Sequence, residues 1–226
     1  TYMKHLKLCL ILMFTSSLLS GCHTASLPQK EISQTVAPIA ALEVAGAIPS
    51  EKIAWFNSDY FNVDGKDEMR NMMLSSVYKD VREIDLYKLF YNGIPETCND
   101  ICDEEKKILS AIDAGAEHLD IIKITSLQMN NILQTYADIE IDQTEKYNLD
   151  KLIYLERYDA YYMIHGDCID TRCEVISGTQ TEDGYLILQY WMNGERYEVT
   201  LKENENNFLF VSNMLLDERS TPKNET

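Results

Sequence analysis

Two pairs of cysteines are the residues of this chain best able to do chemistry. Cys98 and Cys102 lie in the stretch CNDIC, and Cys168 and Cys173 lie in HGDCIDTRC. Four cysteines can form two disulfides, in any of three pairings, or they can supply thiolates to a metal ion. His165, which precedes the second pair, could add an imidazole nitrogen to such a metal site.

The cysteine spacing favours two local disulfides. Cys168 and Cys173 enclose four residues between two predicted strands, and we expect them to face each other across a hairpin. Cys98 and Cys102 are close enough in a loop to close a small ring. The alternatives are a pairing between loop and hairpin, a zinc site of four thiolates, a zinc site formed by His165 with Cys168 and Cys173, or free thiols. The spacings are wider than the two residues typical of a zinc knuckle, so we predict no metal and no cofactor.

Asp159, His165 and Asp167 form a second candidate site. An imidazole titrates near neutral pH, and a neighbouring carboxylate can orient it, so this cluster could serve the acid–base chemistry of a hydrolase or a metal-dependent enzyme. His165 also continues the strand-like alternation of Tyr161 and Met163, which fits a histidine packed at the rim of a sheet.

Other motifs for catalysis or metal binding are weak. The stretch NVDGKDE, residues 62–68, is rich in oxygen ligands but lacks the spacing of a calcium loop, so we interpret it as a solvated turn. The sequence contains no Gly-Xaa-Ser-Xaa-Gly elbow, no glycine-rich phosphate loop and no His-Glu-Xaa-Xaa-His helix. We therefore predict a binding or accessory protein, with an enzyme that uses Asp159, His165 and Asp167 as the alternative.

The N-terminal segment predicts where these residues are placed in the cell. Lys4 and Lys7 precede the apolar run LCLILMFTSSLL, which is too short to span a membrane as a helix. The run ends in LSGC, which resembles the lipobox of bacterial lipoproteins, in which the cysteine receives diacylglycerol and becomes the first residue after cleavage. The resemblance implies that residues 1–21 are a lipoprotein signal peptide. It also implies that Cys22 carries acyl chains, such as palmitate, that anchor the protein on the extracytoplasmic face of the cell membrane.

Residues 22–50 are predicted to be the lipidated cysteine and a flexible tether. They hold three of the five prolines and many small residues, without a sustained helical or strand period. The part APIAALEVAG is apolar enough to dock onto the body of the protein.

The acidic charge of the chain restricts its partners. The formal net charge is −17, and removal of residues 1–21 would leave 18 basic and 37 acidic side chains. Such a surface has no basic patch to displace the counterions of a nucleic acid. We therefore exclude nucleic-acid binding and expect a partner that is a protein, a peptide or a glycan, in addition to the membrane contacted through the lipid.

Residues 51–152 have a helical period. Apolar side chains recur at spacings of three and four, with capping residues before the runs and glycines after two of them. Such stripes of methionine and aromatic residues are typical of a core. The stripes comprise Ile53, Phe56, Tyr60, Phe61, Met69, Met72, Met73, Val77, Ile84, Leu86, Leu89, Phe90, Leu127, Met129, Ile132, Leu133 and Tyr136.

Residues 153–213 change to a period of two. Asp183-Gly184 and Asn193-Gly194 separate alternating runs and predict hairpin turns. The run YLILQYW is apolar on both faces, so we expect a central strand with material packed on each side. The tyrosines of this half either enlarge the core or form a platform for peptide or sugar.

The pattern predicts an α+β fold, in which N-terminal helices pack on a C-terminal antiparallel β-meander of about five strands. Residues 51–213 should form one domain, and residues 214–226 should be a disordered tail. The segments WFNSDYFN, IDLYKLFYNGIPE and YDAYYMIHGD resemble those of uncharacterised lipoproteins of Gram-positive gut anaerobes, which implies an extracellular location. A binding protein, an enzyme and a structural accessory of the envelope are the three function classes that this sequence leaves open.

Overall fold

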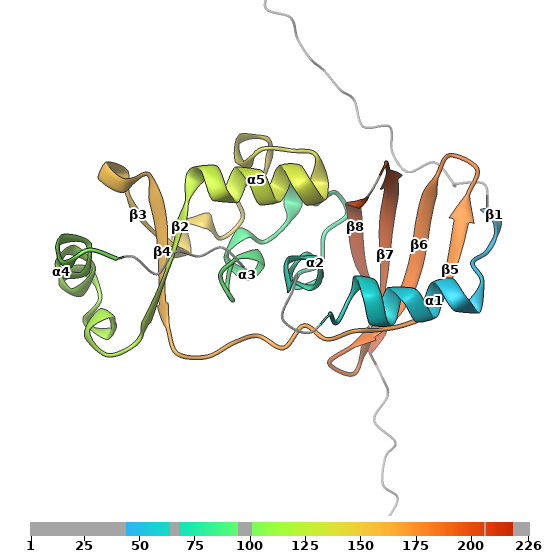
Figure 1. The fold of residues 1–226 in the computed structure, drawn as a ribbon, viewed down its shortest axis with the longest axis horizontal. Coiled ribbons are helices and arrows are strands. Elements are labelled where there is room, and N and C mark those ends of the chain that lie inside the picture. The colour runs from blue at the N-terminus through green and yellow to red at the C-terminus, as the bar shows by residue number, and fades with distance from the viewer. Residues whose placement is uncertain (1–43, 64–67, 95–100, 206, 219–226) are drawn as a thin grey trace, which may run out of the picture. The chain divides into compact units, whose positions relative to one another are not determined.

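Two antiparallel sheets with helices between them make up the computed structural model (Figure 1). The structure describes residues 44–63, 68–94, 101–205 and 207–218. These elements belong to one compact unit that begins at Ala41. The predicted α+β class is confirmed, since helices dominate the first half and a five-stranded antiparallel sheet contains most of the second.

The larger sheet has the strand order β1-β5-β6-β7-β8. Three hairpins join β5 (Glu174–Thr181), β6 (Tyr185–Met192), β7 (Glu195–Asn204) and β8 (Asn207–Glu218) as predicted. The fifth strand is β1 (Val44–Ala47), which pairs antiparallel with the outer side of β5. This strand comes from the range assigned to the tether, and β8 continues past residue 213, where we expected the sheet to end.

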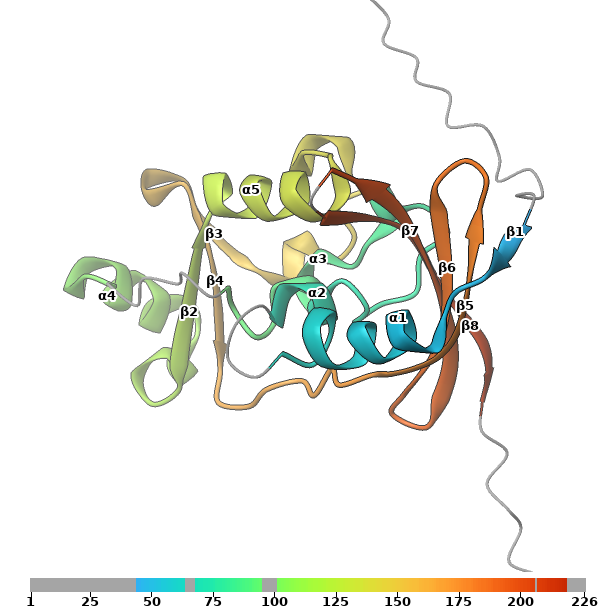
Figure 2. The same cartoon turned by 45° about the vertical axis from the view of Figure 1, so that its right-hand side comes forward.

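The turn between β6 and β7 has the backbone that the sequence predicts. Asn193 and Gly194, between β6 and β7, have φ values of 53° and 86°. Two consecutive residues with positive φ are the requirement of a type I′ turn, in which asparagine and glycine are the preferred residues. Strand β6 is central, as predicted, but both views place the helices on one face of the sheet only (Figures 1 and 2). The expectation of material on each face of β6 is therefore wrong for the described part of the chain.

The smaller sheet has the order β2-β4-β3 and corrects one part of the prediction. Strand β4 (Ala160–His165) was expected to begin the meander, but it pairs with β2 (Asp120–Thr125) along six residues and with β3 (Ile153–Leu155). Strand β2 was not predicted, because DIIKIT is a short apolar run between two helical patterns. The pairing removes β4 from the sheet that contains β5.

The helices are short, and several are single turns. The longest, α5 (Ser126–Ala137), begins with a capping box in which the main-chain N–H of Thr125 donates to Gln128 at 2.9 Å and the hydroxyl of Thr125 accepts from the N–H of Gln128 at 3.2 Å. The other α-helices are α1 (Ser50–Trp55), α2 (Glu68–Met72), α3 (Leu86–Leu89) and α4 (Asp103–Ile112). The short π-helix η1 (Phe56–Tyr60) continues α1. The 3-10 helices are η2 (Val81–Glu83), η3 (Ala114–Glu117), η4 (Ile141–Gln143), η5 (Leu149–Lys151) and η6 (Glu156–Tyr158).

One large core joins the helices to both sheets. Helices α2, α3 and α5 lie between the sheets, and α4 lies on the far side of β2 and β4 (Figures 1 and 2). The predicted stripe residues Met72, Met73, Leu89 and Phe90 have no exposed surface, whereas Leu127, on the outer side of α5, is 67% exposed. Most of the predicted helical core is confirmed, and the placements of Leu127 and of Val77, which is half exposed, are wrong.

A second, smaller core lies under α4. Leu109 of this helix packs with Ala160 and Tyr162, two residues that the alternation had placed together on one face of the strand. The other face of β4 carries Met163 into the large core. No described helix is long and apolar enough to cross a membrane.

Candidate functional site

The connection between β4 and β5 is the most unusual polar feature of the fold. We call residues 166–173 the strap. It crosses from the small sheet to the large one below α2 and α3 (Figures 1 and 2), and it contains both cysteines of HGDCIDTRC. Because β4 and β5 belong to different sheets, the strap is not the turn of a hairpin.

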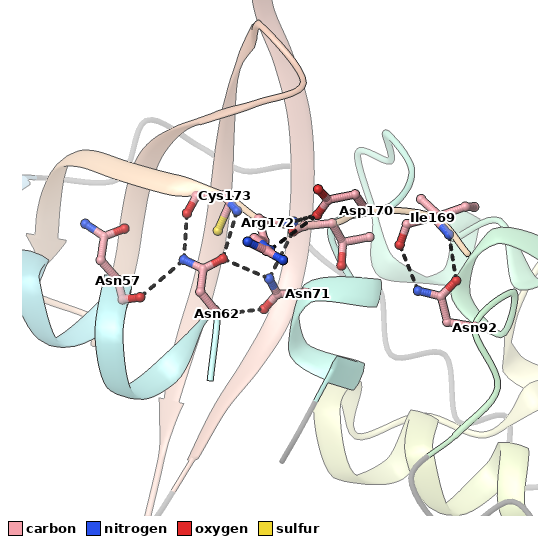
Figure 3. Close-up of polar contacts among 9 residues, drawn as sticks. Asn57, Asn62, Asn71, Asn92, Ile169, Asp170, Arg172 and Cys173 are labelled. Atoms are coloured by element: carbon pink, nitrogen blue, oxygen red, sulfur yellow. Dashed lines mark hydrogen bonds and ion pairs between the residues drawn. The ribbon is translucent and has the colours of Figure 1, made fainter. Parts of the chain in front are cut away.

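Four asparagine side chains hold the main chain along the strap and into β5. We call Asn57, Asn62, Asn71 and Asn92 the asparagine ladder (Figure 3). Asn57 belongs to η1, Asn62 follows η1, Asn71 belongs to α2 and Asn92 follows α3. The helical half of the chain therefore contacts the strap mainly through uncharged amides.

Three members of the ladder each make two hydrogen bonds to a single residue. The Asn92 amide donates to the carbonyl of Ile169 and accepts from its N–H, both at 2.8 Å. The Asn62 amide does the same to Cys173, at 2.7 and 2.9 Å. The third is Asn57, which donates to the carbonyl of Val175 at 2.9 Å and accepts from its N–H at 2.7 Å.

Asn71 completes the series and ties the ladder together. Its amide donates to the carbonyl of Thr171 at 2.9 Å, and it exchanges two contacts of 3.3 Å with Asn62. The Asn62 amide also donates to the carbonyl of Asn57 at 3.2 Å. The ladder therefore engages residues 169, 171, 173 and 175, every second residue of the segment.

The hydrogen-bonding groups of the side-chain amide explain why these four residues are asparagines. In an extended chain, the N–H and C=O of one residue point to the same edge. A side-chain amide carries a donor and an acceptor in the geometry of a peptide group, so it can satisfy both. An aspartate could accept but not donate. The ladder thus takes the place of a neighbouring strand.

Exposure along the strap alternates as it does in a strand. Thr171 and Cys173 are buried, whereas Cys168, Asp170 and Arg172 are exposed. The side chains of Asp170 and Arg172 are 72% and 82% exposed, and they lie 3.9 Å apart. The strap therefore presents a row of outward side chains on a main chain that the ladder holds in place.

His165 and Asp167 meet where the strap begins. The His165 ring stacks on Tyr91, with centroids 4.1 Å apart, and its Nε2 lies 2.8 Å from the Tyr91 carbonyl. Since a carbonyl only accepts, Nε2 carries the proton and donates. The Tyr91 hydroxyl donates to Asp167 at 2.7 Å, which raises the pKa of Tyr91 to about 12. The His165 Nδ1 is 3.5 Å from the same carboxylate oxygen.

Asp159 does not join this pair. It lies before the first residue of β4, whereas His165 is the last, a separation of about 20 Å at roughly 3.3 Å per residue. Its carboxylate accepts from Ser126 at 2.6 Å and from Tyr154 at 2.9 Å, and these hydrogen bonds hold the pKa of Asp159 below its usual value. The structure therefore brings together two of the three residues of the predicted acid–base cluster.

The cysteines of the described residues have free thiols. Cys102 and Cys168 are exposed and Cys173 is buried. The expected hairpin between Cys168 and Cys173 is absent, because the two strands on either side of the strap belong to different sheets. Burial raises the pKa of the Cys173 thiol to about 12, which disfavours the thiolate that a metal needs. Cys168 and Cys173 are not joined in this structure. Cys22 and Cys98 lie outside the described residues, so the pairing of Cys98 stays a prediction.

No metal cluster forms within the described ranges. No three His, Cys, Asp or Glu side chains there are grouped so that they could hold an ion. Residues 64–67 of the oxygen-rich stretch are not described, and Asn62 at its start belongs to the asparagine ladder.

A second polar cluster fixes α4 to the small sheet. The Glu105 carboxylate is 2% exposed and accepts from Lys123 at 2.5 Å, from the Tyr162 hydroxyl and from the N–H of Cys102. Burial raises the pKa of Glu105, but these hydrogen bonds together outweigh it and lower the pKa to about 2. The Lys123 ammonium also lies 5.5 Å from the centre of the Tyr158 ring. Since these groups satisfy one another, we interpret this cluster as structural.

No protein-family model, curated protein sequence or solved structure matches the chain.

Proposed function

We propose that the protein is a lipid-anchored, extracytoplasmic binding module that presents the strap to a partner. The observation that carries this proposal is the asparagine ladder, which orders a solvent-exposed stretch of main chain with the outward side chains Cys168, Asp170 and Arg172. Binding surfaces gain affinity when the cost of ordering them has been met before the partner arrives.

The anchoring part of the proposal is supported by sequence. Residues 1–22 have the order of a lipoprotein signal that ends in Leu19-Ser20-Gly21-Cys22. With residues 23–43 as a tether, the strap would be held away from the bilayer, and the acidic body would be repelled by anionic headgroups.

The enzyme alternative has less support. A general base needs its orienting carboxylate and its substrate-facing groups in one place. Asp159 and His165 lie at opposite ends of β4, and the Asp167 carboxylate accepts from Tyr91. We therefore favour binding over acid–base catalysis.

The experiment that tests the proposal places a photoreactive amino acid at position 170 in the cell that makes the protein. Position 183, an exposed aspartate in the turn between β5 and β6, lies at the opposite end of β5 from the strap and is the matched control. We expect a discrete crosslinked partner from position 170 only, and lipid on Cys22 in the mass spectrum of the N-terminal peptide. Equal crosslinking from both positions, or none from either, would refute the binding role, and an unmodified Cys22 would refute the anchor.

A further inference from the structure

We propose that the outer edge of the strap is a strand-addition site for an extended, basic segment of a partner protein. This inference rests on the proposed function, because it names the class of partner for the same surface. Its basis is a main chain that the ladder holds on one edge and that, on the other, has exposed residues without main-chain hydrogen bonds to the described part of the chain.

The direction of the main-chain groups follows from the ladder. Neighbouring residues of an extended chain point their N–H and C=O groups to opposite edges. Because the ladder engages residues 169, 171 and 173, the groups of residues 168, 170 and 172 point away from it. The Arg172 N–H donates to the Asp170 side chain at 3.0 Å, and no main-chain hydrogen bond within the described residues engages Cys168 or Asp170. The outer edge thus offers the donors and acceptors of a short edge strand.

The ladder lowers the cost of adding a strand. Fixing the backbone of a flexible residue costs conformational entropy, and a mobile loop would lose that entropy on binding. Here Asn62 and Asn92 already fix the main chain at both ends of the strap. In strand addition the main-chain hydrogen bonds supply much of the affinity, and in the strap they can form without an ordering step.

Charge selects a basic partner over an acidic one. Asp167 is 77% exposed and Asp170 is 72% exposed, and Glu174 is exposed where the strap enters β5. Arg172 is the one basic side chain of the strap. With a net charge of −17 on the whole chain, a basic segment is attracted and an acidic one is repelled before contact. Basic residues that lie beside Asp170 and Glu174 would fix the register of the added strand.

The test uses the full chain in detergent micelles and a capped decapeptide of alternating lysine and valine. The control is the same peptide with every backbone nitrogen methylated, which keeps the charge and side chains but cannot pair as a strand. We expect the first peptide to slow hydrogen exchange of the Cys168 and Asp170 amides by at least tenfold. It should also slow alkylation of Cys168, while exposed Cys102 serves as the internal reference.

Two substitutions separate the backbone from the charge. Asp170→Pro removes an outer-edge N–H and should weaken peptide binding by at least tenfold, while slow exchange of the Ile169 and Cys173 amides confirms that the ladder is intact. Asp170→Asn keeps the N–H and should weaken binding by about threefold.

Each contrary outcome has a distinct meaning. If both peptides bind equally without slowing exchange at residues 168 and 170, attraction is only electrostatic and strand addition is refuted. If neither binds while crosslinking from position 170 succeeds, the partner is not a basic strand, although the binding function stands. If crosslinking also fails, the proposed binding function is refuted as well.

Discussion

Replacement of Asn62 by aspartate is the most direct test of the asparagine ladder. The two side chains have nearly the same shape, and both tolerate the left-handed backbone of this residue, which has φ of 54°. The substitution therefore changes the hydrogen-bonding pattern without changing the turn.

The magnitude follows from the two donors that are lost. The Asn62 Nδ2 donates to the carbonyls of Cys173 and Asn57, at 2.7 and 3.2 Å. A hydrogen bond contributes about 1 kcal/mol net, and a buried carbonyl left without a donor costs roughly 1–3 kcal/mol. A carboxylate facing these carbonyls should lower the free energy of unfolding by about 3 kcal/mol.

The assay is equilibrium unfolding in urea. With a slope of about 2 kcal/mol per molar urea, the midpoint should fall by about 1.5 M. The matched control is Asn193→Asp, which adds the same charge at an exposed turn residue with φ of 53°. This control should stay within about 0.5 kcal/mol of the parent. A loss below 0.5 kcal/mol for Asn62→Asp would refute the role of the ladder, and equal losses in both variants would assign the effect to net charge.

Three further predictions concern the polar groups around the strap and under α4. Lys123→Met should destabilise the protein by about 3 kcal/mol, because it leaves the buried Glu105 carboxylate without its cation, and Lys123→Met with Glu105→Leu should recover most of that loss in a urea double-mutant cycle. The pKa of Glu105 falls from 4.5 to about 2 on folding, so its ionised carboxylate contributes about 3 kcal/mol to the free energy of unfolding. This contribution is fully present above pH 4.5 and is lost as the pH falls through 2. The unfolding free energies of the parent and of Glu105→Gln should therefore converge over that range, and a constant difference would contradict the assignment. Asp167→Asn should return the pKa of Tyr91 from about 12 toward its ordinary value of 10, which a carbon NMR titration of labelled tyrosine would measure, whereas Asp170→Asn should leave it unchanged.

The regular elements were the part of the fold that local pattern could predict. Tyr162 and Ala160 share a face because strand side chains alternate, and Asn193-Gly194 forms its turn because both residues tolerate positive φ. Most residues of the helical stripes are buried because apolar side chains three and four positions apart lie on one face of a helix. Such features depend on residues within a few positions of one another.

The partners of the strands were harder to predict. The sequence between β4 and β5 has the length of a hairpin connection, and nothing local indicates that β4 pairs with β2 instead. Paired residues of β2 and β4 lie 35 to 45 positions apart (Thr125 with Ala160, Asp120 with His165), and the Tyr162 hydroxyl contacts Glu105 of α4, 57 positions away. Contacts at that separation are not encoded in any short pattern.

The asparagine ladder was missed for a related reason. Asparagine usually indicates a turn or a cap, and the contacts of Asn57 with β5 and of Asn92 with the strap span 118 and 77 positions. The available signal was Asn71, an uncharged amide beside the buried residues Met69 and Met72 of α2. An amide in an apolar stripe needs a polar partner. The alternation of residues 169–175 indicated an extended main chain that could supply this partner.

Strand β1 determines how a mechanical load would enter the protein. Any pull along the chain from residue 22 reaches β1 before the other described elements, and β1 pairs with β5 through only three residues. Ile48, which follows β1, packs closely against Gly178 of β5: a Cβ added at Gly178 would lie 2.7 Å from the Ile48 Cδ1. None of the asparagines that hold the strap belongs to this junction. A force large enough to peel β1 from the sheet would therefore detach the first strand while leaving the strap in place. Tension on the proposed anchor would then be separated from the surface that we propose binds the partner.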